Sequence, residues 1–577
     1  MMHASVRNAR QEESSRIHHG KGWHRRVGDV HVLKVAGSFY EMGEQHGALM
    51  REDIPTGPLP YYRSFVEKAM GRSSLGVLSP LIWPAVQRTL GRRVARAIPD
   101  FAAETIRGLA DGAGMAHQEL LDGATMPDSL LWLAARVMQL SGAGPAVAHR
   151  LSLGLGCTSA IAWGGATTDG KLMHARNFDY HGVGCWPRTK TVIFHEPDEG
   201  QRYVSVAAAG VALGGVTAMN EAGLTLTVHQ HMFTDRTALG GTPIGLVGDV
   251  IMREANTIDE AQAILESHRP IGCWTYLIAD GRAKEVLCFE ENPERQVAIR
   301  TTEEDETFGY ANIYLDPELG ATEIDLYGSY WRHNHGRYRR VNELLAKRAG
   351  SLDPQGMASI LGDTGDPSCR IRDSIAMVLT VGSVVFQPED GILWMGTGEA
   401  PTSRGTFEAF SLSSEDHAPE QGTLTVGALE PAASRDAFEA YRQAYVAYVD
   451  DGDAAGARCH LARASELAPE QPIYHAIQGI IALAEGSPAE SEEALGRAIA
   501  LGHPDRERLA SFHLWRGRAR DLLGRRREAV VDYRTTLGHP ADPPVRKAAG
   551  KGLRKPYRPK QARRVHVDLS LADVIQP

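Results

Sequence analysis

The pattern of hydrophobic and polar residues changes several times along the chain. Residues 1–28 are polar and predict a mobile tail. Residues 29–156 combine a strand at 31–37 with helical spacing that breaks at Gly and Pro. The first of these helices, within "SFYEMGEQHGALMREDI", begins with a serine that can cap it. We therefore expect an α-rich segment ahead of residue 157.

From residue 156 to about residue 300 the pattern changes to short β-rich runs. Hairpin signals such as "TTDGK" and "NEAG" join these runs, and a later hairpin turns about "PEDG". Helical patterns interrupt the strands at about 242–268 and at 336–348. Antiparallel strands flanked by helices are typical of an α+β layered domain, which we expect over residues 157–425.

After a linker, residues 433–540 predict paired helices with an internal repeat. Gly452 and Gly486 lie 34 residues apart, and Gly524 continues the series after a slip of four residues. A period of 34 residues is typical of tetratricopeptide-like repeats, whose exposed faces often bind a peptide or protein. An irregular helical bundle is the alternative. Residues 541–577 are expected to form a basic tail.

Composition narrows the class of protein. Of the 577 residues, 43% are apolar and 23% are charged, which is the balance of a soluble globular protein. The net charge of −9 gives no hint of a nucleic-acid partner. The six cysteines are scattered without a CxxC pair, so we expect a reducing, cytoplasmic setting and no structural zinc. The most apolar stretch, "SLLWLAARVMQL", contains an arginine and predicts a buried helix rather than a membrane span.

Candidate chemistry gathers at the hairpin that begins with Cys157. If the turn is centred at Asp169–Gly170, antiparallel pairing sets Asp179 opposite Ala160. A small slip in this pairing would bring the Asp179 carboxylate near the start of the first strand. Strand alternation puts Arg176 and Asp179 on opposite faces, so a bulge at "RNFD" would be needed for both to reach the cysteine.

A cysteine thiol needs help to become a nucleophile near neutral pH. Its ordinary pKa is about 8.5, and a nearby arginine lowers it. If the chain were cleaved between Gly156 and Cys157, the new α-amino group, with a pKa of about 7.7–8.0, could act as the base. Glycine before the cysteine leaves the preceding carbonyl uncrowded for such a cleavage.

Four motifs in order resemble one family of enzymes. They are "VAGSFYEMGEQHG", "IRGLADGAG", "GCTSAIAWGGATTDGKLMHARNFDY" and "YANIY". Together they resemble the isopenicillin N acyltransferase-like (peptidase C45) group of N-terminal-nucleophile (Ntn) hydrolases. Choloylglycine hydrolases, penicillin V acylases and acid-ceramidase-like enzymes are more distant relatives of that group. The resemblance covers about residues 30–410 and implies an αββα sandwich, made as one precursor and self-cleaved before the cysteine.

The resemblance also implies roles for individual residues. Cys157 matches the nucleophile, its freed amine the base, and Asp179 the residue that holds the amine. Arg176 matches the arginine near the nucleophile. Asn312 matches the side-chain donor of the oxyanion hole, the group that stabilises the negatively charged oxygen of the reaction intermediate.

Two further positions are matched less closely. The second oxyanion contact maps to His229 or Gln230, and a late arginine maps to Arg370 or Arg372. The expected reaction is ping-pong transfer of an acyl group from a small-molecule amide or acyl thioester, to water or to an amine, without a metal or organic cofactor.

Other interpretations of the same residues stay open at this point. A cysteine at the start of an apolar strand is commonly a buried core thiol. The sandwich could be catalytically silent, a scaffold whose repeats recruit a partner. A papain-like enzyme would depend on His229 and His231 as its base, and two histidines could also ligate zinc if a third ligand were nearby.

Overall fold

The computed structural model describes residues 15–62, 64, 85–141, 156–231, 234, 236–302, 304–324, 328–365, 374–427 and 431–574. The chain divides into two compact units. The first comprises Met1–Ile324, Tyr338–Asp363 and Leu379–Val426. The second comprises Asp325–Arg337, Thr364–Val378 and Gly427–Pro577. Two short stretches within 157–425 thus cluster with the second unit.

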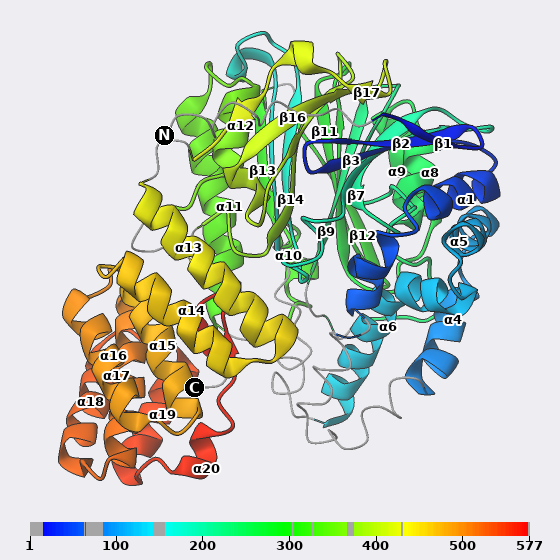
Figure 1. Cartoon of the computed structure of the whole chain (residues 1–577). Coiled ribbons are helices and arrows are strands. Elements are labelled where there is room, and N and C mark those ends of the chain that lie inside the picture. The colour runs from blue at the N-terminus through cyan, green and yellow to red at the C-terminus, as the bar shows by residue number, and fades with distance from the viewer. Residues whose placement is uncertain are drawn as a thin grey trace, which may run out of the picture. The chain divides into compact units, whose positions relative to one another are not determined.

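The first unit is built on two sheets (Figure 1). The larger is antiparallel except where β3 runs parallel to β6. Its ten strands, in sheet order, are β1 (Ile17–His19), β2 (Gly22–Val27), β3 (Val30–Gly37), β6 (Lys190–Pro197), β7 (Tyr203–Ala208), β8 (Thr217–Asn220), β9 (Leu224–Gln230), β10 (Trp274–Asp280), β11 (Glu285–Asn292) and β12 (Arg295–Arg300).

The second sheet has eight strands and carries the candidate site. In order they are β13 (Thr307–Ala311), β4 (Gly156–Ala162), β5 (Met173–Asp179), β14 (Thr380–Gln387), β15 (Ile392–Gly396), β16 (Thr406–Ser411) and β17 (Asp416–His417), with β18 (Leu424–Thr425) also paired to β16. The strands are antiparallel throughout.

The two sheets face each other across an apolar core. Val204 and Phe194 of the larger sheet share this core with Val384, Phe386 and Met395 of the second. Outer helices complete a four-layer αββα sandwich, as the family resemblance implied (Figure 1). The α-helices described in this unit are α1 (Phe39–Leu49), α4 (Arg92–Ala95), α5 (Asp100–Ala113), α6 (His117–Ser141), α8 (Leu246–Glu254), α9 (Ile258–Ser267), α10 (Pro317–Gly320), α12 (Pro354–Leu361) and part of α11 (Gly328–Arg348).

Short helical turns connect these elements. They are η1 (Ile54–Thr56), η2 (Gln87–Gly91), η3 (Gly164–Ala166), η5 (Thr402–Arg404) and η6 (Pro419–Gln421). Of these, η3 matters for the site because it lies in the connection between β4 and β5.

The capped helix of the first motif packs backbone to backbone against the helix of the second. Ser38 and Glu41 form a reciprocal capping box at the start of α1. A Cβ atom at Gly43 would lie 2.1 Å from the Thr105 carbonyl oxygen in α5, and one at Gly108 would lie 2.1 Å from that of Tyr40. These two motifs therefore serve the packing of α1 on α5.

A methyl group at this crossing should destabilise the fold. Gly43→Ala is expected to lower the free energy of unfolding by about 1–3 kcal/mol, because α5 must move away. The matched control is Gly496→Ala in the helix Pro488–Leu501, where nothing lies within 4 Å of an added Cβ. That change should be neutral or stabilise by up to about 1 kcal/mol. Thermal unfolding measures both, and an unaltered transition for Gly43→Ala would contradict the close approach.

The second unit is helical and contains three successive helix pairs. They are α13 (Ala432–Tyr445) with α14 (Ala454–Leu467), α15 (Pro472–Ala484) with α16 (Pro488–Leu501), and α17 (Arg506–Leu522) with α18 (Arg526–Gly538). A π-helical turn, η7 (Val446–Asp451), extends α13. Gly452, Gly486 and Gly524 have φ of 73°, 88° and 76° and lie at the turn within each pair. Left-handed backbone at these turns explains the glycine spacing in the sequence.

The expectation of a mobile tail over 1–28 is wrong for the described residues 15–28. They form β1 and β2, which pair with each other, and β2 also pairs with β3. The polar sequence of β2 suggested exposed chain, but some of its polar residues are buried. Arg25 is 9% exposed, and its Nε donates to the Asp416 carboxylate at 2.9 Å. These polar residues thus form β1 and β2 at one edge of the larger sheet.

The expectation of a basic tail over 541–577 is also wrong for the described residues up to 574. They form α19 (Pro543–Arg554), α20 (Pro559–Ala562), β19 (Val567–Asp568) and β20 (Asp573–Val574). The basic side chains lie on the exposed face of α19, whose other face buries Val545, Ala548 and Ala549.

Candidate active site

Cys157 is the second residue of β4, and its side chain lies in the space between the two sheets. It is 6% exposed and pairs with Phe178 of β5. Asp179 pairs with Gly156, not with Ala160 as the sequence predicted. The register differs because the connection is not a tight turn at 169–170: β4 ends at Ala162, and η3 intervenes before β5 begins at Met173.

Arg176 lies on the same face of the sheet as Cys157. It pairs with Ser159, two residues along β4, so the two side chains are diagonal neighbours. The Arg176 Nη2 donates to the Cys157 Sγ at 3.3 Å. The strand carries no bulge at "RNFD", the feature that would have let both Arg176 and Asp179 reach the cysteine: the register of β5 against β4 is continuous, and the irregularity lies in β14 between Thr380 and Gly382.

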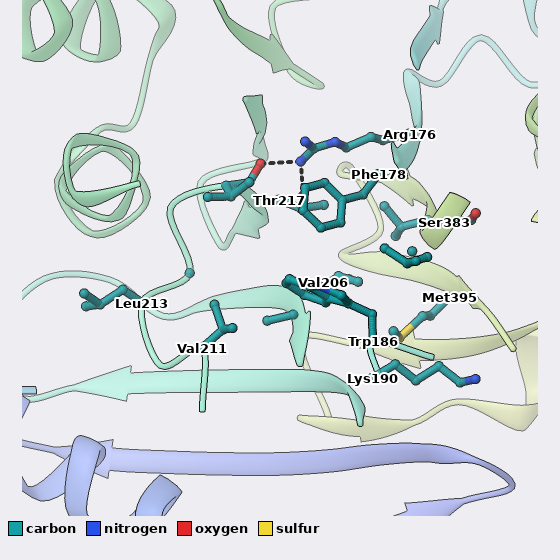
Figure 2. A pocket seen from close by; sticks show the side chains of 16 residues that line it. Arg176, Phe178, Trp186, Lys190, Val206, Val211, Leu213, Thr217, Ser383 and Met395 are labelled. Carbon is teal, nitrogen blue, oxygen red and sulfur yellow. Dashed lines mark hydrogen bonds between the residues drawn. The ribbon is translucent and has the colours of Figure 1, made fainter. Parts of the chain in front are cut away.

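The larger sheet fixes the Arg176 guanidinium in place. Nη1 donates to the Thr217 hydroxyl (Figure 2) and to the Val216 carbonyl at 2.5 Å, and Nη2 donates to the Val228 carbonyl at 2.5 Å. Arg176 is 1% exposed. These oxygens are neutral hydrogen-bond acceptors, and they orient the buried guanidinium toward the Cys157 sulfur.

Asp179 lies beside the peptide link that precedes Cys157. It is fully buried, and its Oδ1 accepts a hydrogen bond from the Thr380 hydroxyl at 2.6 Å. Because Asp179 is three residues from Arg176, its side chain belongs to the opposite face of β5. The main chain at the start of β4 thus lies between a buried carboxylate and a buried guanidinium.

Asn312 joins the two sheets at the cysteine. It follows β13 and is 1% exposed. Its Oδ1 accepts from the Cys157 backbone N at 2.6 Å, and its Nδ2 donates to the Gln230 carbonyl at 2.6 Å. Gln230, the last residue of β9, therefore contacts Asn312 through its main chain.

The two histidines beside Gln230 belong to buried polar contacts. The His229 Nε2 lies 3.0 Å from the Ser159 hydroxyl, and the His231 Nδ1 lies 2.8 Å from the Glu323 carboxylate. His231 also stacks on Tyr314 with ring centroids 3.5 Å apart. Within the described part of the chain, no group of three or more His, Cys, Asp or Glu is arranged to hold a metal ion.

Arg370 and Arg372 lie outside the described residues. The structure brings together Cys157, Arg176, Asn312, the main chain of Gln230 and the strand position of Asp179.

Sequence reasoning missed the groups that hold these residues in place. They are the carbonyls of Val216 and Val228 and the hydroxyls of Thr217 and Thr380. A main-chain carbonyl cannot be recognised in a sequence. Both threonines begin β-strands, where threonine is common, so nothing in the sequence marked them as partners of the site.

Burial raises the pKa of two other core cysteines and of a tyrosine. It raises the pKa of the Cys273 and Cys288 thiols well above the ordinary range, which keeps both protonated. Burial, followed by the nearby Cys157, also raises the pKa of the Tyr180 hydroxyl.

A cavity of about 90 Å³ lies between the sheets next to Arg176. Arg176 and Phe178 of β5 form one wall, and Val206, Trp186 and Met395 contribute apolar surface (Figure 2). Because Phe178 pairs with Cys157, the cavity begins one side chain away from the sulfur.

The facing sheets between helical layers form an αββα sandwich, which is followed by an all-α region. Residues 166–400 match the family model described as "Acyl-coenzyme A:6-aminopenicillanic acid acyl-transferase". This match confirms the resemblance that the four motifs predicted. Gly156 and Cys157 lie just ahead of the matched residues.

Two individual proteins are similar to this chain. An uncharacterized protein of Archaeoglobus fulgidus is 25% identical over 353 residues, which cover 56% of this chain and 56% of the relative. The chain thus spans little more than half the length of that curated relative. The solved structure of a Caenorhabditis elegans N-acylethanolamine-hydrolyzing acid amidase (NAAA) ortholog matches with 16% identity and a TM-score of 0.27, over 40% of this chain and 93% of that one. Within the described ranges, no helix combines the length and the apolar character needed to cross a membrane.

Proposed function

We propose that the first unit is a cysteine-dependent amidohydrolase or acyltransferase that activates itself by cleavage between Gly156 and Cys157. The observation that carries the proposal is the pair of contacts at Cys157: Arg176 on its sulfur at 3.3 Å and Asn312 on its backbone nitrogen at 2.6 Å. The family match supports an acyl-transfer or hydrolase fold. The nucleophile and the cleavage belong to the proposal.

Cleavage would convert the Cys157 backbone nitrogen into an α-amino group. That amine takes the proton of the thiol, and the thiolate attacks the carbonyl carbon of an amide or thioester. The new S–C bond turns the carbonyl oxygen into an oxyanion. When the intermediate collapses, the bond to the leaving amine or thiol breaks, and the α-ammonium supplies the proton that an amine leaving group requires.

The neighbouring residues would then have separate roles. Arg176 favours the thiolate, because its charge is buried and held by neutral oxygens. Asp179, opposite Gly156, holds the ammonium form of the new terminus. Asn312, whose Nδ2 donates to the Gln230 carbonyl beside the cysteine, would stabilise the oxyanion through this amide nitrogen. Water or an acceptor amine attacks the acyl-enzyme in the second half-reaction.

The cavity beside Phe178 is proposed to hold the acyl group. Its apolar wall would receive a hydrophobic acyl chain whose carbonyl reaches the sulfur. Val206→Phe should fill much of this space. We expect it to lower kcat/KM for longer acyl substrates by about tenfold or more while acetyl substrates react as before. The control Val206→Ala keeps the cavity open, and an equal loss with long and short acyl groups would contradict the assignment.

Trapping the acyl-enzyme tests the function itself. Purified protein is mixed with a panel of acyl thioesters and acyl amides, quenched in acid and analysed by peptide mass spectrometry. We expect the acyl mass on the peptide that begins at Cys157. Acylation of another residue, or turnover without any acylated cysteine, would refute the proposed nucleophile.

A further inference from the structure

Residues 567–574 fold back onto the second unit as a small hairpin. β19 and β20 pair Val567 with Val574 and Asp568 with Asp573. Between the strands, Leu569 is 0% exposed and Leu571 is 2% exposed. The hairpin 567–574 therefore buries apolar side chains that its own two short strands could not cover.

The first helix of each of the three helix pairs holds this hairpin. In α13, Tyr441 donates its hydroxyl to the Leu569 carbonyl. In α17, the two Nη atoms of Arg508 donate to the carbonyls of Leu571 and Ala572 at 2.7 Å each. β19 also lies against α15. The hairpin thus covers one continuous face made by α13, α15 and α17.

These polar contacts recognise backbone rather than side chains. Tyr441 and Arg508 both bond to main-chain carbonyls, which any segment of similar shape presents. The selective element is apolar, because Val567, Leu569, Leu571 and Val574 are buried, together with the small side chains of Ser570 and Ala572. In known modes of peptide recognition, hydrogen bonds to the main chain give affinity, and pockets for individual side chains give specificity.

The hairpin is joined to the helices by polar chain. Arg563 and Arg564, immediately before it, are exposed, as are Lys555, Arg558 and Lys560 further back. Release of the hairpin would therefore pull little buried chain away from α19. The helix pairs keep their own contacts, including the packing of Tyr441 on Tyr474 with ring centroids 5.4 Å apart.

We propose that α13, α15 and α17 form a peptide-binding face that the hairpin 567–574 occupies in cis. A partner protein that presents a short apolar turn of similar backbone shape binds there by displacing the hairpin. This inference rests only on the second unit and does not depend on the chemistry at Cys157.

Removing the hairpin tests the face directly. A chain ending at Arg564 is titrated with a fluorescent peptide of residues 565–574, and the full chain is titrated in parallel. We expect the shortened chain to bind at least about tenfold more tightly, because the full chain carries a competing ligand at high effective concentration. A shortened chain that retains its helical circular dichroism and yet does not bind the peptide would overturn the proposal.

Two peptide variants define the recognition. Replacing Leu569 and Leu571 by Asp should abolish binding. Ala572→Gly is the matched control and should bind as well as the parent, because residue 572 has a φ of 48° that glycine adopts freely. Equal binding by the Asp variant would overturn the apolar pattern.

A second design covers the case in which the shortened chain does not fold. A specific protease site is placed between Arg563 and Arg564, and the full chain is cleaved after folding. Excess labelled peptide should then exchange into the cleaved protein, and Arg508→Ala should speed the exchange. A cut hairpin that never exchanges while the protein stays folded would mark it as a fixed part of the core. Light scattering of the full chain identifies the occupant: a concentration-dependent dimer that Arg508→Ala abolishes would replace the partner protein with a second copy.

Discussion

Replacing Cys157 by alanine is expected to abolish acyl transfer while both units stay folded. The change removes the sulfur that Arg176 contacts and leaves a small side chain in an apolar strand. Activity toward any acyl thioester or amide that the parent accepts should fall by about four orders of magnitude or more, since loss of a nucleophile removes the covalent route. Steady-state assays with purified protein measure the effect.

Other cysteines provide the controls. Cys459 is exposed in the second unit, and Cys288 is buried in the larger sheet with a raised thiol pKa. Cys459→Ala should be fully active, and Cys288→Ala should lose some stability but little activity. If Cys157→Ala remained active while Cys288→Ala lost activity without unfolding, the nucleophile would have been assigned to the wrong sulfur.

Replacing Asn312 by alanine is expected to have the second largest effect. The change removes the proposed oxyanion donor and the hydrogen bonds to the Cys157 nitrogen and the Gln230 carbonyl. Loss of one oxyanion donor typically lowers kcat by about a hundredfold to a thousandfold. We expect that loss in kcat with little change in KM, because the donor acts mainly on the oxyanion. Rates with a reactive thioester separate the two constants.

Asn177 offers a matched comparison for Asn312. It is also a buried asparagine with two hydrogen bonds, donating to the Leu361 carbonyl at 2.8 Å and accepting from Ser383 at 2.9 Å. Asn177→Ala should therefore cost similar stability, about 1–3 kcal/mol. It should leave kcat within a few fold of the parent. If both variants lost kcat equally, the effect of Asn312 would be structural rather than catalytic.

Local pattern predicted the elements of the first unit well. The strand at 31–37, the serine-capped helix after it and the hairpin from residue 156 all appear as β3, α1, β4 and β5. Periodicity and capping are properties of short segments, so they survive into the fold with little influence from distant residues.

Pairing and burial could not be predicted in the same way. The register of β4 against β5 depends on how the connection folds, and that connection is held by distant partners: Trp163 N donates to the Glu306 carbonyl at 3.0 Å, and Thr168 N to that of Leu352 at 2.9 Å. Likewise, Arg25 is buried only because Asp416 lies against it. Contacts between residues far apart in sequence leave no local trace in the pattern.

The candidate site shows the same division. Sequence motifs pointed to Cys157, Arg176 and Asn312, and the fold brings their atoms together. The oxygens that orient Arg176 belong to Val216, just before β8, to Thr217 of β8 and to Val228 of β9. They reach Arg176 only because the two sheets face each other in the fold. Gly43 and Gly108, in motifs of the same resemblance, serve helix packing instead.

The most direct test is the state of the bond between Gly156 and Cys157 in active protein. Intact mass measurement and N-terminal sequencing of the purified, active material decide it. We expect two fragments, residues 1–156 and 157–577, with a free α-amino group on the cysteine, and an uncleaved Cys157→Ala chain. Full activity from a chain in which the link before the cysteine is still intact would contradict the proposed amine base and, with it, the self-activating mechanism.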